Sequence, residues 1–441
     1  MKIYGQHDER TVQQLERCVA AEDGARAVLC ADGHVGYSMP IGGVVAYKDF
    51  VSPSGVGYDI ACGNMAVQTN ILARDVSHVD MERLGDEIQQ RISFGVGRKN
   101  NEPIGEAPVF DRIAHSSVRQ QASLIQQAQQ QLGTVGSGNH YVDVLEDEAG
   151  VLWVGVHFGS RGIGHKTATG FMNLAAGRAF DDRPGREDMD APPSLLNIHD
   201  PSGQDYIEAM TIAGEYAYAG REAVVAKVLE ILGAEAKWTV HNHHNFAWRE
   251  THDGQDFWVV RKGATPAFPG QWGFVGGSMG DISVILRGVE SEASKTALYS
   301  TVHGAGRVMS RTQAAGKQKW TKAKWGCGNY RVCDFTAPIA EFERGRGDAH
   351  PKCPKCGNRL IRHSSSMSRA ENGAVDFDAE KLKLVERGIV LRGAGADEAP
   401  PVYRRLQAVL DAHAGTIEIA HTLQPRIVVM AGRDEFDPYK D

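Results

Sequence analysis

Apolar positions along the chain follow two different periods, and together they predict a mixed fold of strands and helices. Short apolar runs that end at glycine or at a polar residue are typical of buried strands, and they occur at 27–30, 40–47, 151–158 and 238–246. Residues 204–233 carry alanine- and valine-rich faces at helical spacing, so we expect a long helix that packs on a sheet. The expected fold class is therefore α+β (α/β mixed).

Three further helical regions are predicted. A short amphipathic helix is expected within 11–28, just before the first strand. Residues 75–133 are rich in Gln, Arg and Glu at helical spacing, notably over 114–132, and this region is predicted to be helical scaffold. Arg307 and Arg311 lie four positions apart after a glycine loop, and this spacing predicts a helix that starts beside His303.

The composition is that of an ordinary globular protein. Of 441 residues, 42% are hydrophobic and 23% are charged. No apolar run approaches the ~20 residues of a membrane span and no apolar leader begins the chain, so we expect a cytoplasmic protein with no membrane partner. The formal net charge of −7 argues against non-specific wrapping of nucleic acid, although a local basic groove is compatible with it.

Cysteine usage indicates a reducing compartment. The chain has seven cysteines, and four of them lie late in the sequence, which suits metal-bound or catalytic thiols better than a disulfide framework. The neighbouring run 317–325 interleaves four lysines with two tryptophans. This run is suited to base stacking and phosphate contact, and a solvated lysine face with half-buried tryptophans is the alternative.

The glycine-rich stretch 52–64 is the first candidate site. Asp59 and Cys62 stand three positions apart between glycines that permit sharp turns. Asp and Cys are a hard and a soft ligand, and a thiolate can bridge two divalent ions, whereas a neutral imidazole nitrogen binds one. A glycine turn with a buried core cysteine is the alternative interpretation.

Histidines next to predicted strands are candidate ligands for the same centre. His140 follows a glycine loop and precedes a strand, and His157 lies at the end of the next strand. In the run 241–244, alternation along a strand turns His241 and His243 to one face and His244 to the other. Each histidine taken alone is also typical of a structural role.

Cations and glycines elsewhere indicate phosphate binding. Arg261 and Lys262 precede a glycine, and the loop 276–283 offers backbone N–H groups that can hold a phosphate. Asp32 and His34 follow the first strand, where they can orient metal ligands or form a solvated turn.

Taken together, these segments resemble the RtcB-type RNA-splicing ligase family from about Asp32 to Gly432. The resemblance implies an RtcB-like α/β fold with sheets around a central site for two metal ions. The motifs that carry it are Asp32-Gly33-His34, Pro40-Ile41-Gly42-Gly43, Asp59-Ile60-Ala61-Cys62-Gly63, Gly138-Asn139-His140, His157-Phe158-Gly159-Ser160-Arg161-Gly162, His244-Asn245, Arg261-Lys262-Gly263-Ala264-Thr265, Gly277-Ser278-Met279-Gly280 and His303-Gly304-Ala305-Gly306-Arg307.

The resemblance also implies an activity. The family uses GTP and two Mn²⁺ ions to join RNA ends that bear a 3′-phosphate or 2′,3′-cyclic phosphate to 5′-hydroxyl ends, in RNA repair or tRNA splicing and with a possible helper protein. His303 is then the nucleophile that takes GMP from GTP. The implied metal ligands are Asp59, Cys62, His140, His157 and His244, with Cys62 bridging. The implied guanylate-binding residues are Asn139, Asn245, Gly277, Ser278, Met279, Ser283, Gly304, Ala305 and Gly306. The candidate clamps for RNA or nucleotide phosphates are Arg161, Arg261 and Lys262.

The chain departs from the family pattern in three places. Ala431 stands where the family usually has a lysine near the guanylate, and an acidic tail follows at 433–441. Gly276 stands where proline is common. The third departure is an insertion, expected at 313–365 between a catalytic core of residues 1–312 and a closing part at 366–441.

The insertion carries the four late cysteines. A Cys-x-x-Cys pair followed by glycine is typical of a zinc knuckle, so we expect a structural Zn²⁺ in a ribbon-like unit, with His350 or His363 as substitute ligands. Free thiols are the alternative. The ribbon either contacts RNA or staples a long loop. The expected zinc ligands are Cys327, Cys333, Cys353 and Cys356.

Two other functions are compatible with these residues. The first is a metal-dependent RNA-end phosphodiesterase or phosphatase that does not guanylate, because Ala431 lacks the family cation. The second is a non-catalytic RNA-binding protein that uses the ribbon.

Overall fold

The chain divides into two compact units. The computed structural model describes residues 1–183, 188–317, 320–321, 323–329, 333, 335–342, 351–363, 366–367 and 371–432. The larger unit comprises Met1–Ser310 and Asp376–Asp441, and the smaller unit comprises Arg311–Val375. The insertion expected at 313–365 lies within the smaller unit.

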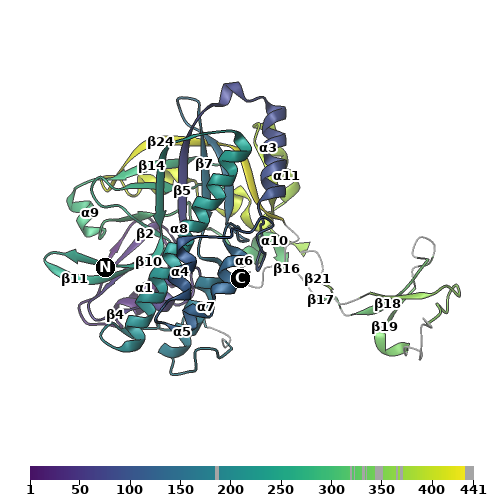
Figure 1. The fold of residues 1–441 in the computed structure, drawn as a ribbon, viewed down its shortest axis with the longest axis horizontal. Coiled ribbons are helices and arrows are strands. Elements are labelled where there is room, and N and C mark those ends of the chain that lie inside the picture. Colours follow the sequence, from purple (N-terminus) through teal and green to yellow (C-terminus); the bar gives the residue numbers. More distant parts are fainter. Residues whose placement is uncertain are drawn as a thin grey trace. The chain divides into compact units, whose positions relative to one another are not determined.

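An eight-stranded sheet forms the centre of the larger unit (Figure 1). Its strand order is β13-β14-β24-β6-β7-β5-β9, and β23 pairs with β24 in parallel. These strands are β5 (Gly63–Leu72), β6 (Tyr141–Glu146), β7 (Val151–Phe158), β9 (Ala236–His243), β13 (Trp272–Val275), β14 (Ser283–Gly288), β23 (Val390–Ala394) and β24 (Ile417–Gly432).

A five-stranded sheet in the order β1-β2-β3-β11-β10 forms a second layer. Its strands are β1 (Lys2–Ile3), β2 (Arg26–His34), β3 (Ile41–Tyr47), β10 (Asn245–His252) and β11 (Gln255–Lys262). Two small pairs join β4 (Phe50–Val51) to β8 (Leu196–Asn197) and β12 (Ala264–Pro266) to β15 (Ser300–Val302).

Helix α8 (Pro201–Leu232) is the long helix that 204–233 predicts, and it contributes to two apolar cores. Its first half contributes Tyr206 and Met210 to a core with residues of β2 and β3. Its second half contributes Val224 and Val228 to a core on the eight-stranded sheet. The other helices of this unit are α1 (Glu9–Val19), α2 (Pro53–Val56), α3 (His78–Arg91), α4 (Pro108–Ala114), α5 (Arg119–Ala122), α6 (Ile125–Gln131), α7 (Arg161–Ala175), α9 (Glu292–Thr296), α11 (Phe377–Glu386) and α12 (Leu406–Asp411).

The helical region predicted over 75–133, notably 114–132, consists of the four separate helices α3, α4, α5 and α6, of which α5 and α6 lie within 114–132. Ser116 and Ser117 donate hydroxyl hydrogen bonds to Glu208, and Ser116 also accepts one from Val118 N. Serine side chains that bond nearby backbone compete with the helix ladder. Helix α4 therefore stops at Ala114.

The smaller unit contains short strands around the cysteines, including a three-stranded sheet in the order β19-β18-β20. No helix in the described parts of either unit is long and apolar enough to cross a bilayer. The described elements of this unit are α10 (Arg311–Ala315), β16 (Gly316–Lys317), β17 (Trp320–Thr321), β18 (Lys324–Cys327), β19 (Thr336–Pro338), β20 (Leu360–His363), β21 (Ser366–Met367) and β22 (Glu371–Asn372).

Candidate metal centre

The ends of four adjacent strands, β6, β7, β5 and β9, lie side by side in the eight-stranded sheet. A candidate ligand lies at or next to each of these strand ends. The antiparallel register pairs Gly63 of β5 with Phe158 of β7 and with His243 of β9. It also pairs Tyr141, the first residue of β6, with a residue near the end of β7. The sheet thereby gathers segments that are far apart in the sequence. The candidate ligands at these ends are Cys62, His140, His157 and His244.

Cys62 lies at the middle of the gathered side chains. Its Sγ is 3.3 Å from His157 Nε2 and 3.6 Å from His140 Nε2. Asp59 Oδ2 is 3.0 Å from His140 Nε2, and the ring centres of His157 and His244 are 5.0 Å apart. Ligand atoms of Cys62, His157 and His244 form one group, and those of Asp59, Cys62 and His140 form a second, each with all its atoms within 4.8 Å of one another. The two groups share the thiol.

This donor set fits two divalent cations. A thiolate can bridge two ions, and imidazoles and a carboxylate complete the two groups. His244 Nδ1 is buried without a hydrogen-bond partner. Buried polar atoms are normally paired, so this unpaired atom is accounted for if the group of Cys62, His157 and His244 holds a cation.

Burial keeps the rings of His157 and His244 neutral, which is the form in which imidazole binds a metal ion. It lowers the pKa of His157 and of His244 well below the usual value, and neighbouring cationic groups act in the same direction. Burial alone would raise the pKa of Asp59, but the contact with His140 outweighs it and the pKa is lowered. Burial, and then the Asp59 charge, raise the pKa of the Cys62 thiol well above its usual value. The thiol therefore has to lose its proton as a cation binds.

Close backbone approach holds the loop 59–62 in place. Ala61 N donates a hydrogen bond of 2.7 Å to Asn245 O, at the break between β9 and β10. Gly159 packs against the same loop from the end of β7, where a Cβ would lie only 2.3 Å from Asp59 Oδ1. Only glycine permits this approach, which explains a glycine directly after the strand.

Arg221 of α8 ties the strand ends together, a role that the sequence did not reveal. Its side chain is fully buried and donates to Ala61 O at 3.0 Å and to Phe158 O at 2.6 Å, next to two of the candidate ligands. It also bonds the rings of His241 at 2.8 Å and His243 at 2.9 Å. These two histidines share a face, as predicted, and belong to neither ligand group. The sequence offers little signal for this role, because α8 also carries other charged residues such as Glu215 and Glu222.

His303 lies beside the centre, on the loop after β15. Its ring centre is 4.8 Å from that of His244. Asp32 Oδ2 accepts hydrogen bonds from His303 Nδ1 at 2.7 Å and from His303 N at 3.0 Å. Burial would raise the pKa of Asp32, but His303 outweighs it and the pKa is lowered. Because a carboxylate can only accept, Nδ1 carries the proton and Nε2 keeps its lone pair. Asp32 thus orients His303, whereas the sequence had suggested a metal ligand as its partner.

The prediction of a helix that starts at His303 is wrong. Gly306 has a φ of 74°, which a right-handed helix excludes, and Arg307 forms an isolated antiparallel bridge with Tyr403. The Arg307 guanidinium donates to Asp397 O at 2.8 Å and pairs with Glu398 at 3.3 Å. This segment is therefore a loop fastened to η3 and η4 (Ala396–Glu398 and Pro400–Val402).

We expect Asp32→Asn to slow any reaction at His303 about 10²- to 10⁴-fold, because an amide can donate to Nδ1 and place the proton on Nε2. The rate of covalent labelling by GTP measures this effect. Mn²⁺ stoichiometry should not change, since Asp32 contacts no ligand group. A variant that labels at the parent rate would remove the role assigned to Asp32.

Two glycine loops expected to hold the guanylate border His303. A Cβ at Gly304 would lie 3.6 Å from Gly276 O, so the two loops are neighbours. Ser283 Oγ accepts a hydrogen bond of 3.2 Å from Gly277 N and closes the second loop. The other residues that were expected to bind the guanylate contact neighbouring parts of the protein. Asn139 and Ser278 are half-buried, Met279 and Ala305 pack in apolar clusters, and Asn245 Oδ1 accepts a hydrogen bond of 2.6 Å from Gly263 N.

Arg261 and Lys262 do not have the surroundings expected of phosphate clamps. Arg261 is fully buried and pairs with Glu250 at 2.5 Å. Lys262 is also buried, and its Nζ donates to Tyr37 O at 2.6 Å and to Ser54 O at 3.1 Å. Their charges are used within the fold, because both lie on the covered strand β11.

Arg161 is placed differently. Its Nε donates to Thr134 Oγ1 at 3.2 Å and its Nη2 donates to Gly95 O at 2.8 Å. A Cβ at Gly136 would lie 2.6 Å from Arg161 Nη1 and 2.0 Å from His140 Nδ1, so this nitrogen is next to a candidate ligand. Arg161 remains a candidate for contact with a phosphate.

Ala431 follows the last pair of β24 and β6, which joins Met430 to Tyr141. The next position of β6 toward the centre is His140. Ala431 is buried, so the departure from the family pattern lies at the border of the metal centre and supplies no charge there. The acidic tail at 433–441 lies outside the described residues.

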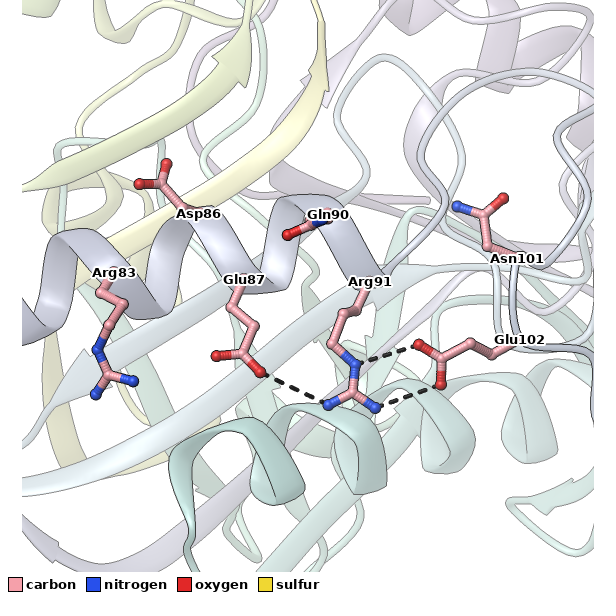
Figure 2. A pocket seen from close by; sticks show the side chains of 7 residues that line it. All are labelled: Arg83, Asp86, Glu87, Gln90, Arg91, Asn101 and Glu102. Atoms are coloured by element: carbon pink, nitrogen blue, oxygen red, sulfur yellow. Dashed lines mark hydrogen bonds and ion pairs between the residues drawn. The ribbon is translucent and has the colours of Figure 1, made fainter.

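A surface hollow elsewhere on the larger unit has no ligand atom of the centre in its wall. It lies beside α3, where Arg91 pairs with Glu87 at 3.7 Å and with Glu102 at 3.2 Å (Figure 2). Because these charges neutralise one another, we interpret the wall of the hollow as a network of surface ion pairs and not as a binding site.

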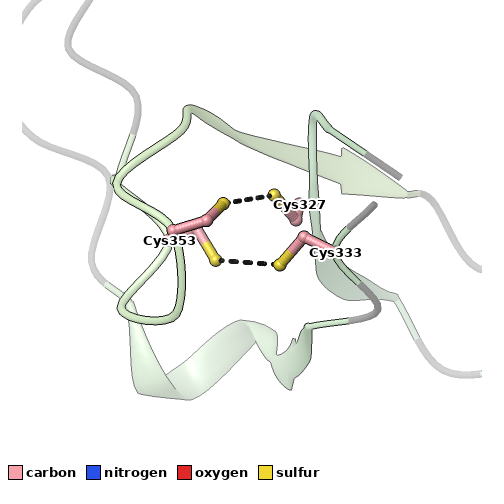
Figure 3. Close-up of side chains that lie close together, drawn as sticks. Cys327, Cys333 and Cys353 are labelled. Atoms are coloured by element: carbon pink, nitrogen blue, oxygen red, sulfur yellow. Dashed lines mark hydrogen bonds between the residues drawn. The ribbon is translucent and has the colours of Figure 1, made fainter. Parts of the chain in front are cut away.

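A second cluster lies in the smaller unit, where the four late cysteines converge (Figure 3). The Sγ atoms of Cys327 and Cys356 are 3.3 Å apart, and those of Cys333 and Cys353 are 3.7 Å apart. These separations are far longer than a disulfide bond, and they match the edges of a tetrahedron around an ion with Zn–S bonds of about 2.3 Å. His363 is not part of the group, and His350 lies outside the described residues.

We expect the purified protein to hold one Zn²⁺ per chain in this cluster, and Cys353→Ser to lose it. Elemental analysis of protein prepared without added zinc measures the stoichiometry. Cys18→Ser, which replaces a buried core thiol, is the matched control and should retain the metal. Equal zinc content in both variants would show that the cluster is not a zinc site.

The fold and the first cluster define an α/β protein with a candidate metal centre, and sequence comparisons identify its family. Residues 14–122 and 104–327 match the family model of tRNA-splicing ligase RtcB. The chain is 28% identical over 426 residues to RNA-splicing ligase RtcB of Escherichia coli K12, covering 90% of this chain and 88% of that protein. It is 32% identical over 369 residues to tRNA-splicing ligase RtcB of Archaeoglobus fulgidus, and 31% identical over 364 residues to that of Thermococcus kodakarensis. These alignments cover 66% and 65% of this chain, and 74% of each relative. The chain belongs to the RtcB family of RNA-splicing ligases.

Proposed function

We propose that this protein is a GTP- and Mn²⁺-dependent ligase that joins RNA 3′-phosphate or 2′,3′-cyclic phosphate ends to 5′-hydroxyl ends, in RNA repair or tRNA splicing. The observation that carries the proposal is the 2.7 Å hydrogen bond from His303 Nδ1 to Asp32 Oδ2, beside two ligand groups that share Cys62. This arrangement offers a histidine nucleophile next to a candidate dinuclear centre.

His303 Nε2 is the atom that attacks. With its proton held on Nδ1, the ring uses the Nε2 lone pair to form a P–N bond to the α-phosphorus of GTP, and the bond to pyrophosphate breaks. An oxygen of the RNA 3′-phosphate then attacks the same phosphorus, and His303 leaves. The 5′-hydroxyl finally attacks the activated RNA phosphate, which forms the phosphodiester and releases GMP. A cyclic end first takes up water and opens to the 3′-phosphate.

The residues present can hold the two metal ions. Asp59, Cys62 and His140 would bind one Mn²⁺, and Cys62, His157 and His244 would bind the other. When bound, the ions would offset the charge on the entering and leaving oxygens of each displacement. Arg221 keeps the ligand loops in position through its hydrogen bonds to Ala61 O and Phe158 O.

The position of Ala431 favours one alternative, a metal-dependent RNA-end phosphodiesterase that does not guanylate. Both functions are tested by incubation with GTP labelled at the α-phosphate, Mn²⁺ and an RNA that has a cyclic phosphate end and a 5′-hydroxyl end. The ligase predicts label on the protein and a joined RNA. Cyclic-end opening without label would support the alternative and contradict the ligase.

A further inference from the structure

The smaller unit is strongly basic, whereas the rest of the chain is acidic. Residues 311–375 contain 13 Lys and Arg and five Asp and Glu, a formal charge of +8 in a chain whose net charge is −7. The remaining residues therefore carry −15. A unit of this size with such a positive charge is suited to a polyanion, since a basic surface displaces condensed counterions from phosphates.

The described part of this unit exposes its cations. Lys324, Lys352, Lys355, Arg359 and Arg362 are all exposed. Glu341 is the one acidic residue among its described side chains. The cations named here are thus displayed on the surface of the described part of the unit.

Two of these cations stand directly opposite each other. Lys352 and Arg359 form an antiparallel bridge in the hairpin that carries Cys353 and Cys356. Both side chains are exposed, so the hairpin places two cations beside the cysteines.

The cysteines and the apolar residues explain how this surface is supported. The core of the unit is small, with Trp325, Leu360 and three of the cysteines fully or almost fully buried. Units of this size with a small core are commonly stabilised by disulfides or by a structural metal. Trp325 is 2% exposed and its Nε1 donates to Phe342 O at 3.2 Å, so it is a core residue and not a stacking platform for bases. Gln318, Lys319 and Lys322 lie outside the described residues.

We propose that the zinc-held unit 311–375 is an RNA-binding element that holds the phosphate backbone of the substrate RNA through its exposed cations, without reading base sequence. The identity of the polyanion as RNA rests on the function proposed above. The charge distribution and the facing cations do not depend on it.

The test compares two full-length variants that lose the same charge. In the first, Lys324, Lys352 and Arg362 of the smaller unit are all changed to Gln. In the second, the exposed Lys48, Lys237 and Lys381 of the larger unit are changed to Gln. A fluorescent single-stranded RNA with a 3′-phosphate is titrated with each protein at several salt concentrations, and zinc content and labelling by GTP without RNA are measured on the same preparations.

We expect the first variant to bind RNA about tenfold more weakly than the parent, and the slope of log K against log salt to decrease by about 2, because each lost contact to a single strand removes ~0.7. The second variant should bind within about twofold of the parent. A third variant, with Lys324 and Lys352 changed to Arg and Arg362 to Lys, keeps the charge and should keep the affinity. Zinc content and labelling by GTP should be equal in all four proteins.

Equal RNA affinity in the first variant and the parent would overturn the proposal. It would instead favour an acidic protein as the partner of the basic unit. Equal weakening in the first two variants would also overturn it, because net charge alone would then explain the effect. Failure of the parent to label with GTP would contradict the ligase reaction, and the RNA titration would still decide the role of the smaller unit.

Discussion

The His303→Ala variant, incubated with Mn²⁺ and GTP labelled at the α-phosphate, will carry no covalent label, whereas the parent protein will. The reason is the geometry of one ring. Asp32 holds the proton on Nδ1, and the free Nε2 lone pair lies next to the candidate metal centre. Alanine removes the attacking atom, so we expect label and RNA ligation to fall below detection, a loss of at least about 10⁴-fold.

The matched control is His199→Ala, which removes an exposed histidine and should label like the parent. Mn²⁺ content separates loss of the nucleophile from loss of the centre, because His303 belongs to neither ligand group. Label that persists in His303→Ala would show that another residue receives the guanylate.

The Cys62→Ser variant will lose both metal ions together. In the parent protein, Cys62 Sγ is the one ligand atom common to the two groups. A serine hydroxyl keeps its proton at neutral pH and does not replace a bridging thiolate. We expect Mn²⁺ content to fall from two per chain to less than one, and ligation at fixed Mn²⁺ to fall about 10³-fold or more, equivalent to ~4 kcal/mol of barrier.

Cys18→Ser tests whether any buried thiol would have this effect, since Cys18 lies in an apolar core and its Sγ donates a hydrogen bond of 3.7 Å to Ser38 O. It should bind two Mn²⁺ ions. Two tightly bound ions in Cys62→Ser would show that the thiol is not shared, and would leave the two groups as independent sites.

The strands and their ligands were accessible to sequence analysis because the ligands occupy local positions. Cys62, His140 and His244 lie directly before or after a strand, and His157 is the last residue but one of β7, so these four candidate ligands lie at strand ends. Alternation along 241–244 likewise separates His244 from its two neighbours, and the structure confirms that separation.

Other features depend on contacts between distant segments, which local patterns do not record. Arg221 reads as one charge in a long helix, and only the fold shows that it joins two ligand loops. Arg307 has helical spacing to Arg311, yet its bond to Asp397 fixes an extended loop. Arg261 precedes a glycine as a phosphate clamp would, but Glu250 on the neighbouring strand neutralises it.

The central claim is that one thiolate is shared by two cations beside His303, and a crystal structure of the protein grown with Mn²⁺, with anomalous scattering measured at the manganese edge, tests it most directly. The account predicts two anomalous peaks about 3.5–4 Å apart, both within bonding distance of Cys62 Sγ, one on the Asp59 and His140 side and one on the His157 and His244 side. A single peak, or two peaks that do not contact Cys62, would contradict it.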